Sequence, residues 1–302
     1  MRLASIDIGS NAIRFQVVNL NEDQNNKKPY KKIEQIRFPL RLGQDVFRMG
    51  KLSRVTEEKF VKLMQVFKTL MDVYEVDDYM ACATSAMRES ENGREIIRRV
   101  YYQHGLKIDI IDGNQEADII HMAIQNWIPQ YPCMHIDVGG GSTELNIFLN
   151  QKKIASKSFK IGSVRSTLLS DEEREEIFEK MQHWLHTLDI DTEEEFIAIG
   201  TGGNINKLFN MSPQSEQKSK TTFLEELEEL QLFIEQHSFE ERIQKLKMNK
   251  DRADVILPAS DIYIRTMKMV NAHRIIVPGV GMKDGILLYM MEKIKAWNGV
   301  EL

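Results

Sequence analysis

Glycine-rich turns follow apolar, strand-like segments at three points of the chain, at residues 7–11 (DIGSN), 137–143 (DVGGGST) and 200–204 (GTGGN). Glycine permits positive φ and close backbone approach, so successive N–H groups can point into one concavity that suits phosphate oxygens. The hydroxyls of Ser10, Ser142 and Thr143 add neutral donors. A single turn of this kind is also typical of an ordinary hairpin, but three of them favour phosphate binding. No Gly-Lys-Ser/Thr follows, which excludes a Walker loop.

Carboxylates stand beside two of these turns. Asp7 and Asp137 end equivalent apolar segments, and Glu144 follows the second turn. Magnesium is usually held by one or two carboxylates together with waters and phosphate oxygens, which Asp137 and Glu144 could supply. We therefore expect Mg²⁺, which Mn²⁺ could replace. The alternatives are a turn-capping role for each aspartate and a solvated strand position for Glu144.

An arginine and a further glutamate complete the set of candidate catalytic residues. Arg88 follows a strand in a loop of small polar residues and offers a fixed fork of donors to phosphate. Its alternative role is a surface ion pair with Glu89 or Glu91. Glu116 falls in the first turn of a predicted helix, where a carboxylate could activate water or simply favour the helix dipole.

The elements that must position these residues repeat along the chain. Three strands joined by tight turns open each half, and SIDIGSNAIRFQVVNL matches HIDVGGGSTELNIFLN, with 130 residues between Asp7 and Asp137. Such self-similarity predicts two duplicated α/β domains that face each other across a cleft. We place them at 1–127 and 128–302, and the final helix could pack back on the first domain.

Several other elements are predicted along the chain. Residues 32–43 are predicted to form a strand, and 221–249 an acidic, helical segment with leucines at helical spacing. Gly105 ends a helix, Ser238 and Glu241 form a capping box, and 251–271 is a helix interrupted at Pro258.

The composition of the chain limits the classes of function and the location that we expect. A formal charge of −5 argues against a general nucleic-acid binder, which needs a broadly basic face, so any polyanion must be gripped locally. The N-terminus has no leader pattern and no apolar run reaches the length of a membrane span, so we expect a cytoplasmic protein. Cys82 and Cys133 lack metal-ligand spacing and are expected to be buried free thiols rather than a disulfide.

These segments together resemble the exopolyphosphatase/guanosine pentaphosphate phosphohydrolase (Ppx/GppA) family. The resemblance runs in order through nine blocks: IDIGSNAIRF, RLG with MGKLS, ATSAMRESENG, IDGNQEADII, HIDVGGGSTEL, FKIGSVRST, IAIGTGGN, RADVILPA and VPGVGMKDGILL. It implies a duplicated actin-like fold of the sugar kinase/Hsp70 ATPase type, related to ribonuclease H, which agrees with the internal repeat.

The resemblance also implies roles for individual residues. Glu116 would be the base that activates water, Asp137 and Glu144 would hold the metal and help to order that water, and phosphates would be held by Ser10, Asn11, Arg88, Ser142, Thr143 and the amides of Gly139, Gly140 and Gly141. Such a site positions groups and neutralises charge, which is what phosphoryl transfer requires.

The implied function is metal-dependent removal of orthophosphate from the end of inorganic polyphosphate. A pppGpp 5′-phosphohydrolase, an actin-like kinase or ATPase, and a non-catalytic sensor of polyphosphate or (p)ppGpp are the alternatives. The expected partners are polyphosphate or pppGpp, with a homodimer left open and with no DNA and no membrane.

The chain departs from the family pattern at Ala12, Gln115 and Asp118. Asp118 would weaken polyanion binding if it pointed into the site, but we expect it to point outward. Because the chain ends near residue 302 without a later helical domain, we expect a preference for short polyphosphate.

Overall fold

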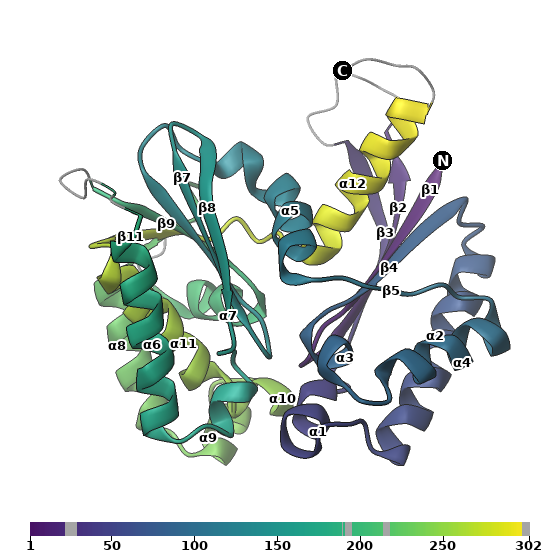
Figure 1. Ribbon diagram of the computed structural model, residues 1–302, viewed down its shortest axis with the longest axis horizontal. Coiled ribbons are helices and arrows are strands. Elements are labelled where there is room, and N and C mark those ends of the chain that lie inside the picture. Colours follow the sequence, from purple (N-terminus) through teal and green to yellow (C-terminus); the bar gives the residue numbers. More distant parts are fainter. Residues whose placement is uncertain (22–28, 189, 191–194, 214–217, 298–302) are drawn as a thin grey trace. The chain divides into compact units, whose positions relative to one another are not determined.

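A computed structural model describes residues 1–21, 29–188, 190, 195–213 and 218–297. The chain forms two compact units, which Figure 1 shows in colours that follow the sequence. Unit 1 comprises Met1–Ala123 and Gly281–Leu302, and unit 2 comprises Ile124–Val280. Compared with the expected boundary after residue 127, the chain passes into unit 2 slightly earlier. It returns to unit 1 after Val280, so the final helix belongs to unit 1.

Unit 1 is built on a five-stranded sheet with the order β3-β2-β1-β4-β5. The strands are β1 (Arg2–Ile8), β2 (Ile13–Leu20), β3 (Tyr30–Phe38), β4 (Asp78–Ala83) and β5 (Asp109–Ile110). The helices are α1 (Leu42–Met49), α2 (Arg54–Val73), α3 (Ser85–Glu89), α4 (Gly93–His104), α5 (Gly113–Ile124) and α12 (Met282–Trp297). β1 runs antiparallel to β2 and parallel to β4, so β1 and β4 both end at the same edge of the sheet.

Helices cover both faces of this sheet (Figure 1). On one face, Ala4 and Ile6 of β1 pack against Phe60 and Phe67 of α2. On the other, the adjacent residue Leu3 joins a cluster with α5 and α12. Successive side chains of a strand point to opposite faces, so a strand covered on both faces must be apolar at nearly every position. This explains why the segments that form β1 and β2 are largely apolar, whereas the mostly exposed β3 contains several charged residues.

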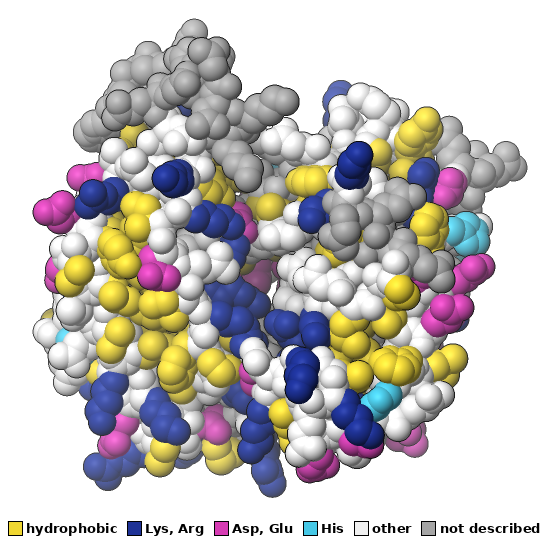
Figure 2. All heavy atoms as spheres, turned by 180° about the vertical axis from the view of Figure 1, so that it is seen from behind, with side chains coloured by type: hydrophobic (Ala, Val, Ile, Leu, Met, Phe, Trp, Pro, Cys, Tyr) yellow, Lys and Arg dark blue, Asp and Glu magenta, His cyan; other side chains and the backbone are white. Residues whose placement is uncertain are grey.

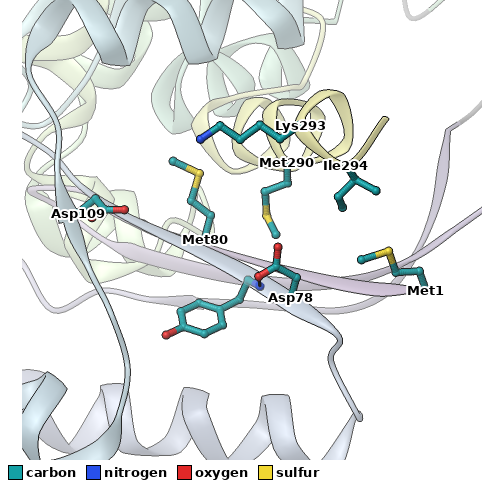
Figure 3. A pocket seen from close by; sticks show the side chains of 8 residues that line it. Met1, Asp78, Met80, Asp109, Met290, Lys293 and Ile294 are labelled. Carbon is teal, nitrogen blue, oxygen red and sulfur yellow. Dashed lines mark hydrogen bonds between the residues drawn. The ribbon is translucent and has the colours of Figure 1, made fainter. Parts of the chain in front are cut away.

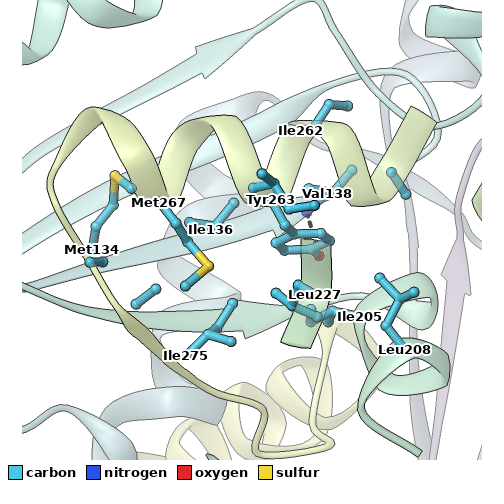
Figure 4. Packing of buried hydrophobic residues seen from close by; sticks show 14 of the residues in the cluster. Met134, Ile136, Val138, Ile205, Leu208, Leu227, Ile262, Tyr263, Met267 and Ile275 are labelled. Carbon is cyan, nitrogen blue, oxygen red and sulfur yellow. Dashed lines mark hydrogen bonds between the residues drawn. The ribbon is translucent and has the colours of Figure 1, made fainter. Parts of the chain in front are cut away.

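Unit 2 is built on a six-stranded sheet with the order β10-β11-β9-β6-β7-β8. The strands are β6 (Cys133–Val138), β7 (Thr143–Leu149), β8 (Lys152–Phe159), β9 (Ile197–Thr201), β10 (Thr221–Phe223) and β11 (Arg274–Ile276). The helices are α6 (Asp171–His186), α7 (Gly203–Met211), α8 (Leu224–Glu235), α9 (Phe239–Gln244), α10 (Lys250–Ala253) and α11 (Ile256–Met269), with single 3₁₀ turns η1 (Gln125–Trp127) and η2 (Arg165–Thr167). Figure 4 shows the core beneath α11, where Met134 and Ile136 of β6 meet Tyr263 and Met267.

The duplication predicted from the sequence is confirmed by the strand register. Asp7 pairs with Arg14 across β1 and β2, and Asp137 pairs with Glu144 across β6 and β7, so both partners are shifted by the same 130 residues. The irregularity between Val17 and Val18 recurs between Ile147 and Phe148. Both sheets therefore repeat one backbone, including its β-bulge, and side chains at equivalent positions can be compared directly.

Three element predictions are corrected by the structure. The strand expected over residues 32–43 ends at Phe38, and α1 begins at Leu42. Residues 221–223 form strand β10 before α8 begins, because they pair with β11. The break expected at Pro258 lies before α11, and Pro258 falls within the first turn of that helix, where its missing N–H needs no intrahelical partner. The helix end at Gly105 and the Ser238–Glu241 capping box are confirmed.

Both cysteines are buried and free, as predicted. Burial raises the pKa of the Cys82 and Cys133 thiols to about 12, so they are inert at neutral pH. Within the described residues, no helix has both the length and the apolarity to cross a bilayer. Figure 2 shows acidic and basic side chains on the same face of the molecule, in keeping with the modest net charge.

Candidate functional site

Two carboxylates of unit 2, Asp137 and Glu144, lie side by side next to the glycine loop (residues 139–142). We call them the acid pair. Asp137 is the penultimate residue of the buried strand β6, and Glu144 is its direct partner on β7, so both side chains project from the same face of the sheet. Oδ1 of Asp137 accepts a hydrogen bond of 2.7 Å from the Thr201 hydroxyl, and Oε1 of Glu144 accepts one of 2.8 Å from the Ser158 hydroxyl. Both residues are buried; Glu144 is only 2% exposed.

The acid pair fits the requirements of Mg²⁺. Among the described residues, no group of three His, Cys, Asp or Glu side chains could form a complete protein cage for a metal. Magnesium does not require one, because it retains waters and binds phosphate oxygens beside one or two carboxylates. Two adjacent buried carboxylates also repel each other unless a cation or proton lies near them. The predicted ligands Asp137 and Glu144 are therefore placed together as a metal site needs.

The glycine loop is held by a second loop, residues 161–166. The amides of Ser163, Val164 and Arg165 donate to the carbonyls of Gly139 and Gly140 at 2.9 Å, and Arg165 Nε donates to the Gly141 carbonyl at 2.6 Å. With its carbonyls held in this way, the loop has the amides of Gly140, Gly141 and Ser142 as its candidate phosphate donors.

Two predicted phosphate ligands do not fit this geometry. The Gly139 amide donates to the Ser142 carbonyl at 3.0 Å and closes the turn. The Thr143 hydroxyl donates to the Ile161 carbonyl at 2.6 Å in the interior, with the residue fully buried. Both groups stabilise the loop rather than face a ligand. The sequence shows which residue types the turn contains, but the partner of Thr143 comes from a loop 18 residues away, and the partner of the Gly139 amide lies within the turn itself.

Substituting Gly162 by alanine is expected to destabilise unit 2 and to lower activity. A Cβ at this position would lie 2.7 Å from backbone atoms of Gly140, Gly141 and Ser142, which cannot yield without moving the glycine loop. Overpacking of this kind typically costs about 1–3 kcal/mol. Denaturant unfolding would measure the loss. Gly281→Ala, where no atom lies within 4 Å of the new Cβ and the backbone is not in the left-handed region, controls for losing a glycine as such. A Gly162→Ala protein of unchanged stability would contradict the contact.

The third glycine-rich turn lies beside the acid pair. Gly202 has a φ of 117°, and a Cβ added to it would lie 3.0 Å from the Val138 carbonyl and 3.7 Å from Asp137 Oδ1. Only glycine permits this conformation together with so close an approach. Thr201, the residue before it, is the donor to Asp137. Two of the three predicted turns therefore converge on Asp137 within unit 2.

Unit 1 uses the equivalent positions differently. Asp7, the counterpart of Asp137, forms an ion pair of 3.0 Å with Arg14, which stands where unit 2 has Glu144. Burial raises the pKa of the Asp7 carboxyl, and the Arg14 guanidinium opposes that rise. Asp7 is thus neutralised within its own unit instead of forming a second acid pair. Arg14 is not among the site residues predicted from the sequence, although the 130-residue offset from Glu144 identifies it.

The first glycine-rich turn is held by its neighbours in unit 1. The Ser10 hydroxyl lies 2.8 Å from the Ser85 hydroxyl at the start of α3, and the Ser10 and Asn11 carbonyls accept from the amides of Gly43 and Arg41. Ser10 is buried, whereas Asn11 is partly exposed. The predicted phosphate ligands Ser10 and Asn11 therefore sit on a rigid turn at the carboxyl end of β1.

Arg88 and Glu116 lie together in unit 1; we call them the arginine–glutamate pair. Arg88 lies on α3 after β4, and Glu116 lies in the first turn of α5 after β5. Arg88 Nη1 donates to the Ile111 carbonyl at 2.6 Å and lies 3.8 Å from Glu116 Oε2. The Glu116 side chain is 12% exposed, so it is largely shielded while still open to water. The arrangement can hold an ionised carboxylate beside a fixed positive charge.

The departures around Glu116 leave this pair intact. Asp118 is exposed, as expected from its outward position on the helix. Gln115 accepts a hydrogen bond from the Asp112 amide, and the Asp112 side chain in turn accepts from the amides of Asn114 and Gln115. Gln115 therefore contributes to the cap of α5, which fixes the position of Glu116 in the first turn.

A pocket of about 460 Å³ lies elsewhere in unit 1. Figure 3 shows it between α12 and the amino ends of the strands, with Met80, Met290 and Lys293 among its lining residues. Asp78 begins β4, whereas the candidate residues follow the carboxyl ends of the strands. Because ligands of open α/β sheets bind outside the carboxyl ends, we do not assign the reaction to this pocket.

Two related α/β units, with buried acids beside glycine turns in unit 2, define a protein whose site is suited to phosphate chemistry. Comparison with known proteins identifies it further: residues 21–294 match the model of the Ppx/GppA phosphatase family. The chain belongs to this family.

Individual relatives agree with this assignment. The chain is 30% identical over 240 residues to a bifunctional 3-dehydroquinate synthase/phosphatase of Fusobacterium nucleatum, a match that covers 76% of this chain but only 31% of that protein. It is 21% identical to exopolyphosphatase 1 of Mycobacterium tuberculosis, over 97% of this chain and 89% of that protein. The crystal structure of the Aquifex aeolicus Ppx/GppA family member has 26% identity and a TM-score of 0.75, and covers 97% of this chain and 98% of its own. The predicted fold class, a duplicated actin-like α/β fold, is thereby confirmed.

Proposed function

We propose that this protein is a metal-dependent exopolyphosphatase that removes orthophosphate from the end of inorganic polyphosphate. The observation that supports it best is the buried acid pair beside the glycine loop, a combination suited to a divalent cation and phosphate oxygens. Family membership and the similarity to an exopolyphosphatase from M. tuberculosis support the same reaction.

In this proposal each group has a defined task. Asp137 and Glu144 hold Mg²⁺, which when bound neutralises charge on the phosphate oxygens. Glu116 takes a proton from the attacking water, whose oxygen forms a bond to the terminal phosphorus as the bridging P–O bond breaks. Arg88 donates to phosphate oxygens, and its positive charge lies 3.8 Å from the Glu116 carboxylate. The amides of Gly140, Gly141 and Ser142 bind phosphate as neutral donors.

The test is phosphate release from defined polyphosphates in the presence of Mg²⁺. We expect hydrolysis of short oligophosphates, with a kcat/KM at least as high as that for a polymer of hundreds of units. Because the net charge of the protein is −5, binding depends on the local donors of the site, and phosphates far from the site add little to the binding free energy. A clear preference for the long polymer would contradict the expected chain length while leaving the reaction itself in place.

The pppGpp 5′-phosphohydrolase is the second candidate, because the same groups would act on any terminal phosphoanhydride. Parallel assays with pppGpp and polyphosphate separate the two functions by their kcat/KM values. Release from neither substrate, together with binding of either, would instead favour the sensor. If nucleotide titration showed binding that depends on the adenine base, the kinase or ATPase hypothesis would be favoured.

A further inference from the structure

A chain of polar side chains, buried except for Ser156 on β8, leads from the edge of the unit 2 sheet to Asp137. The Ser156 hydroxyl donates to Asn146 Oδ1 at 2.7 Å, and Asn146 Nδ2 lies 3.0 Å from His135 Nδ1. His135 Nε2 lies 2.8 Å from the Thr201 hydroxyl, which donates to Asp137 Oδ1 at 2.7 Å. We call these four residues before Asp137, on strands β8, β7, β6 and β9, the relay.

The direction of each hydrogen bond in the relay follows from the carboxylate of Asp137, at which the relay ends. An ionised Asp137 only accepts, so the single proton of the Thr201 hydroxyl must point to it. The Thr201 oxygen then accepts from His135, which fixes the proton of the neutral ring on Nε2. The other ring nitrogen, Nδ1, is left as the acceptor for the Asn146 amide.

The relay lies in an environment where apolar residues would normally be expected. His135 and Thr201 are 0% exposed, and polar groups at such positions are costly unless every partner is present. The positions in unit 1 that are equivalent to His135 and Asn146 are Ser5 and Gln16, and both donate to the carbonyl of Lys283. In unit 1 the pair therefore supports the backbone of α12, whereas in unit 2 it leads to a carboxylate.

The end of β9 is fixed from a second side as well. The Tyr263 hydroxyl donates to the Thr201 carbonyl and accepts from the Val138 amide at 3.3 Å, and Figure 4 shows Tyr263 reaching Val138 from α11. The backbone of Thr201 is thereby fixed independently of its side chain. What remains to be set is the rotation of the hydroxyl, and His135 is the group that sets it.

We propose that His135 is a positioning residue for the metal site. It holds the Thr201 hydroxyl with its proton directed at Asp137, and this hydrogen bond fixes the orientation of the Asp137 carboxylate and thus its affinity for a divalent cation. This inference rests on the proposed function, in which Asp137 is a metal ligand. Groups that orient metal ligands in this way commonly change metal affinity when removed.

The experiment measures Mn²⁺ binding to the full chain by the electron paramagnetic resonance signal of the free ion, without substrate. We expect His135→Leu, which removes the ring donor, to weaken Mn²⁺ binding by about 10-fold. His135→Gln is expected to restore affinity to within about 3-fold of the wild type, because its amide can donate to Thr201. Ser5→Ala, the equivalent position in unit 1, is the matched control and should leave Mn²⁺ affinity unchanged.

A second variant tests the inference even if the His135→Leu protein does not fold. Thr201→Val keeps the side-chain shape but removes the hydroxyl, and should weaken Mn²⁺ binding at least as strongly as His135→Leu. If His135 acts only through Thr201, the double variant binds no more weakly than Thr201→Val alone. Melting curves of the metal-free variants report folding separately.

Two results would overturn the inference while leaving the proposed function standing: wild-type Mn²⁺ affinity in a folded His135→Leu protein, or additive losses in the double variant. A third result would also overturn the metal assignment. If Asp137→Asn binds Mn²⁺ as the wild type does, then Asp137 is not a ligand, and both the metal assignment and this inference are wrong.

Discussion

Replacement of Glu116 by glutamine is expected to lower phosphate release from polyphosphate by about 1000-fold, since general base catalysis typically contributes about 10²–10⁴-fold. The amide has nearly the same size and keeps the helix start intact, but it cannot take a proton from water. The 3.8 Å approach of the Arg88 guanidinium favours an ionised carboxylate and opposes the effect of partial burial, which favours the neutral acid. The measurement is kcat at saturating Mg²⁺ and substrate.

Asp118→Asn is the matched control for this change. Asp118 lies two residues further along the same helix and is exposed, so removing its charge should change kcat by less than about 2-fold, as expected for a screened surface charge. Near-normal turnover by the Glu116 variant, in a protein whose Asp137 variant is inactive, would show that another group activates the water.

Replacement of Glu144 by glutamine is expected to have opposite effects on activity and on the stability of the metal-free protein. Phosphate release should fall by at least about 100-fold, because a metal ligand is lost. Without metal, however, Asp137 and Glu144 repel each other as buried neighbours, and the neutral amide removes that repulsion. The melting temperature of the metal-free protein should rise by about 2–4 °C, and its further increase on adding Mg²⁺ should disappear.

Asp7→Asn provides the contrast from the duplicated unit. Here the carboxylate already has a partner, Arg14 at 3.0 Å, so its removal leaves a partly buried guanidinium without that ion pair. The melting temperature should therefore fall, while the increase caused by Mg²⁺ persists. If Glu144→Gln lowered the melting temperature of the metal-free protein as Asp7→Asn does, the acid pair would not be the cation site.

Much of the fold could be predicted because short segments of the sequence reveal the repeat. Glycine turns after apolar strands, at a constant offset, specify the same strand-turn-strand unit twice, and the shared register of β1–β2 and β6–β7 confirms it. Pro258 was placed wrongly because a proline inside an apolar stretch is compatible with either a break or the first turn of a helix. Only the packing of α11 on the sheet decides between them.

The residue types of the site could be predicted from the sequence, but the hydrogen-bond partners of those residues could not. Glu144 and Asp137 could be chosen because acids beside a glycine turn are informative by themselves. The internal role of Thr143 depends on where the loop 161–166 lies, and that is a tertiary contact, whereas the Gly139 amide bonds to Ser142 within its own turn. His135 could not be identified at all, because a single histidine within an apolar strand is most often a satisfied core residue.

The β-bulges shared by the two sheets also bear on how the protein can associate. Each bulge lies where an edge strand, β3 or β8, pairs with its neighbour, and both edge strands are rich in exposed lysines, such as Lys31, Lys32, Lys152 and Lys153. The opposite edges, β5 and β10, contain only two and three residues. Bulges, lysines and short strands are the means by which proteins prevent edge-to-edge pairing. Strand addition is thus disfavoured at every described sheet edge, and a homodimer of this protein would have to use helices or loops instead.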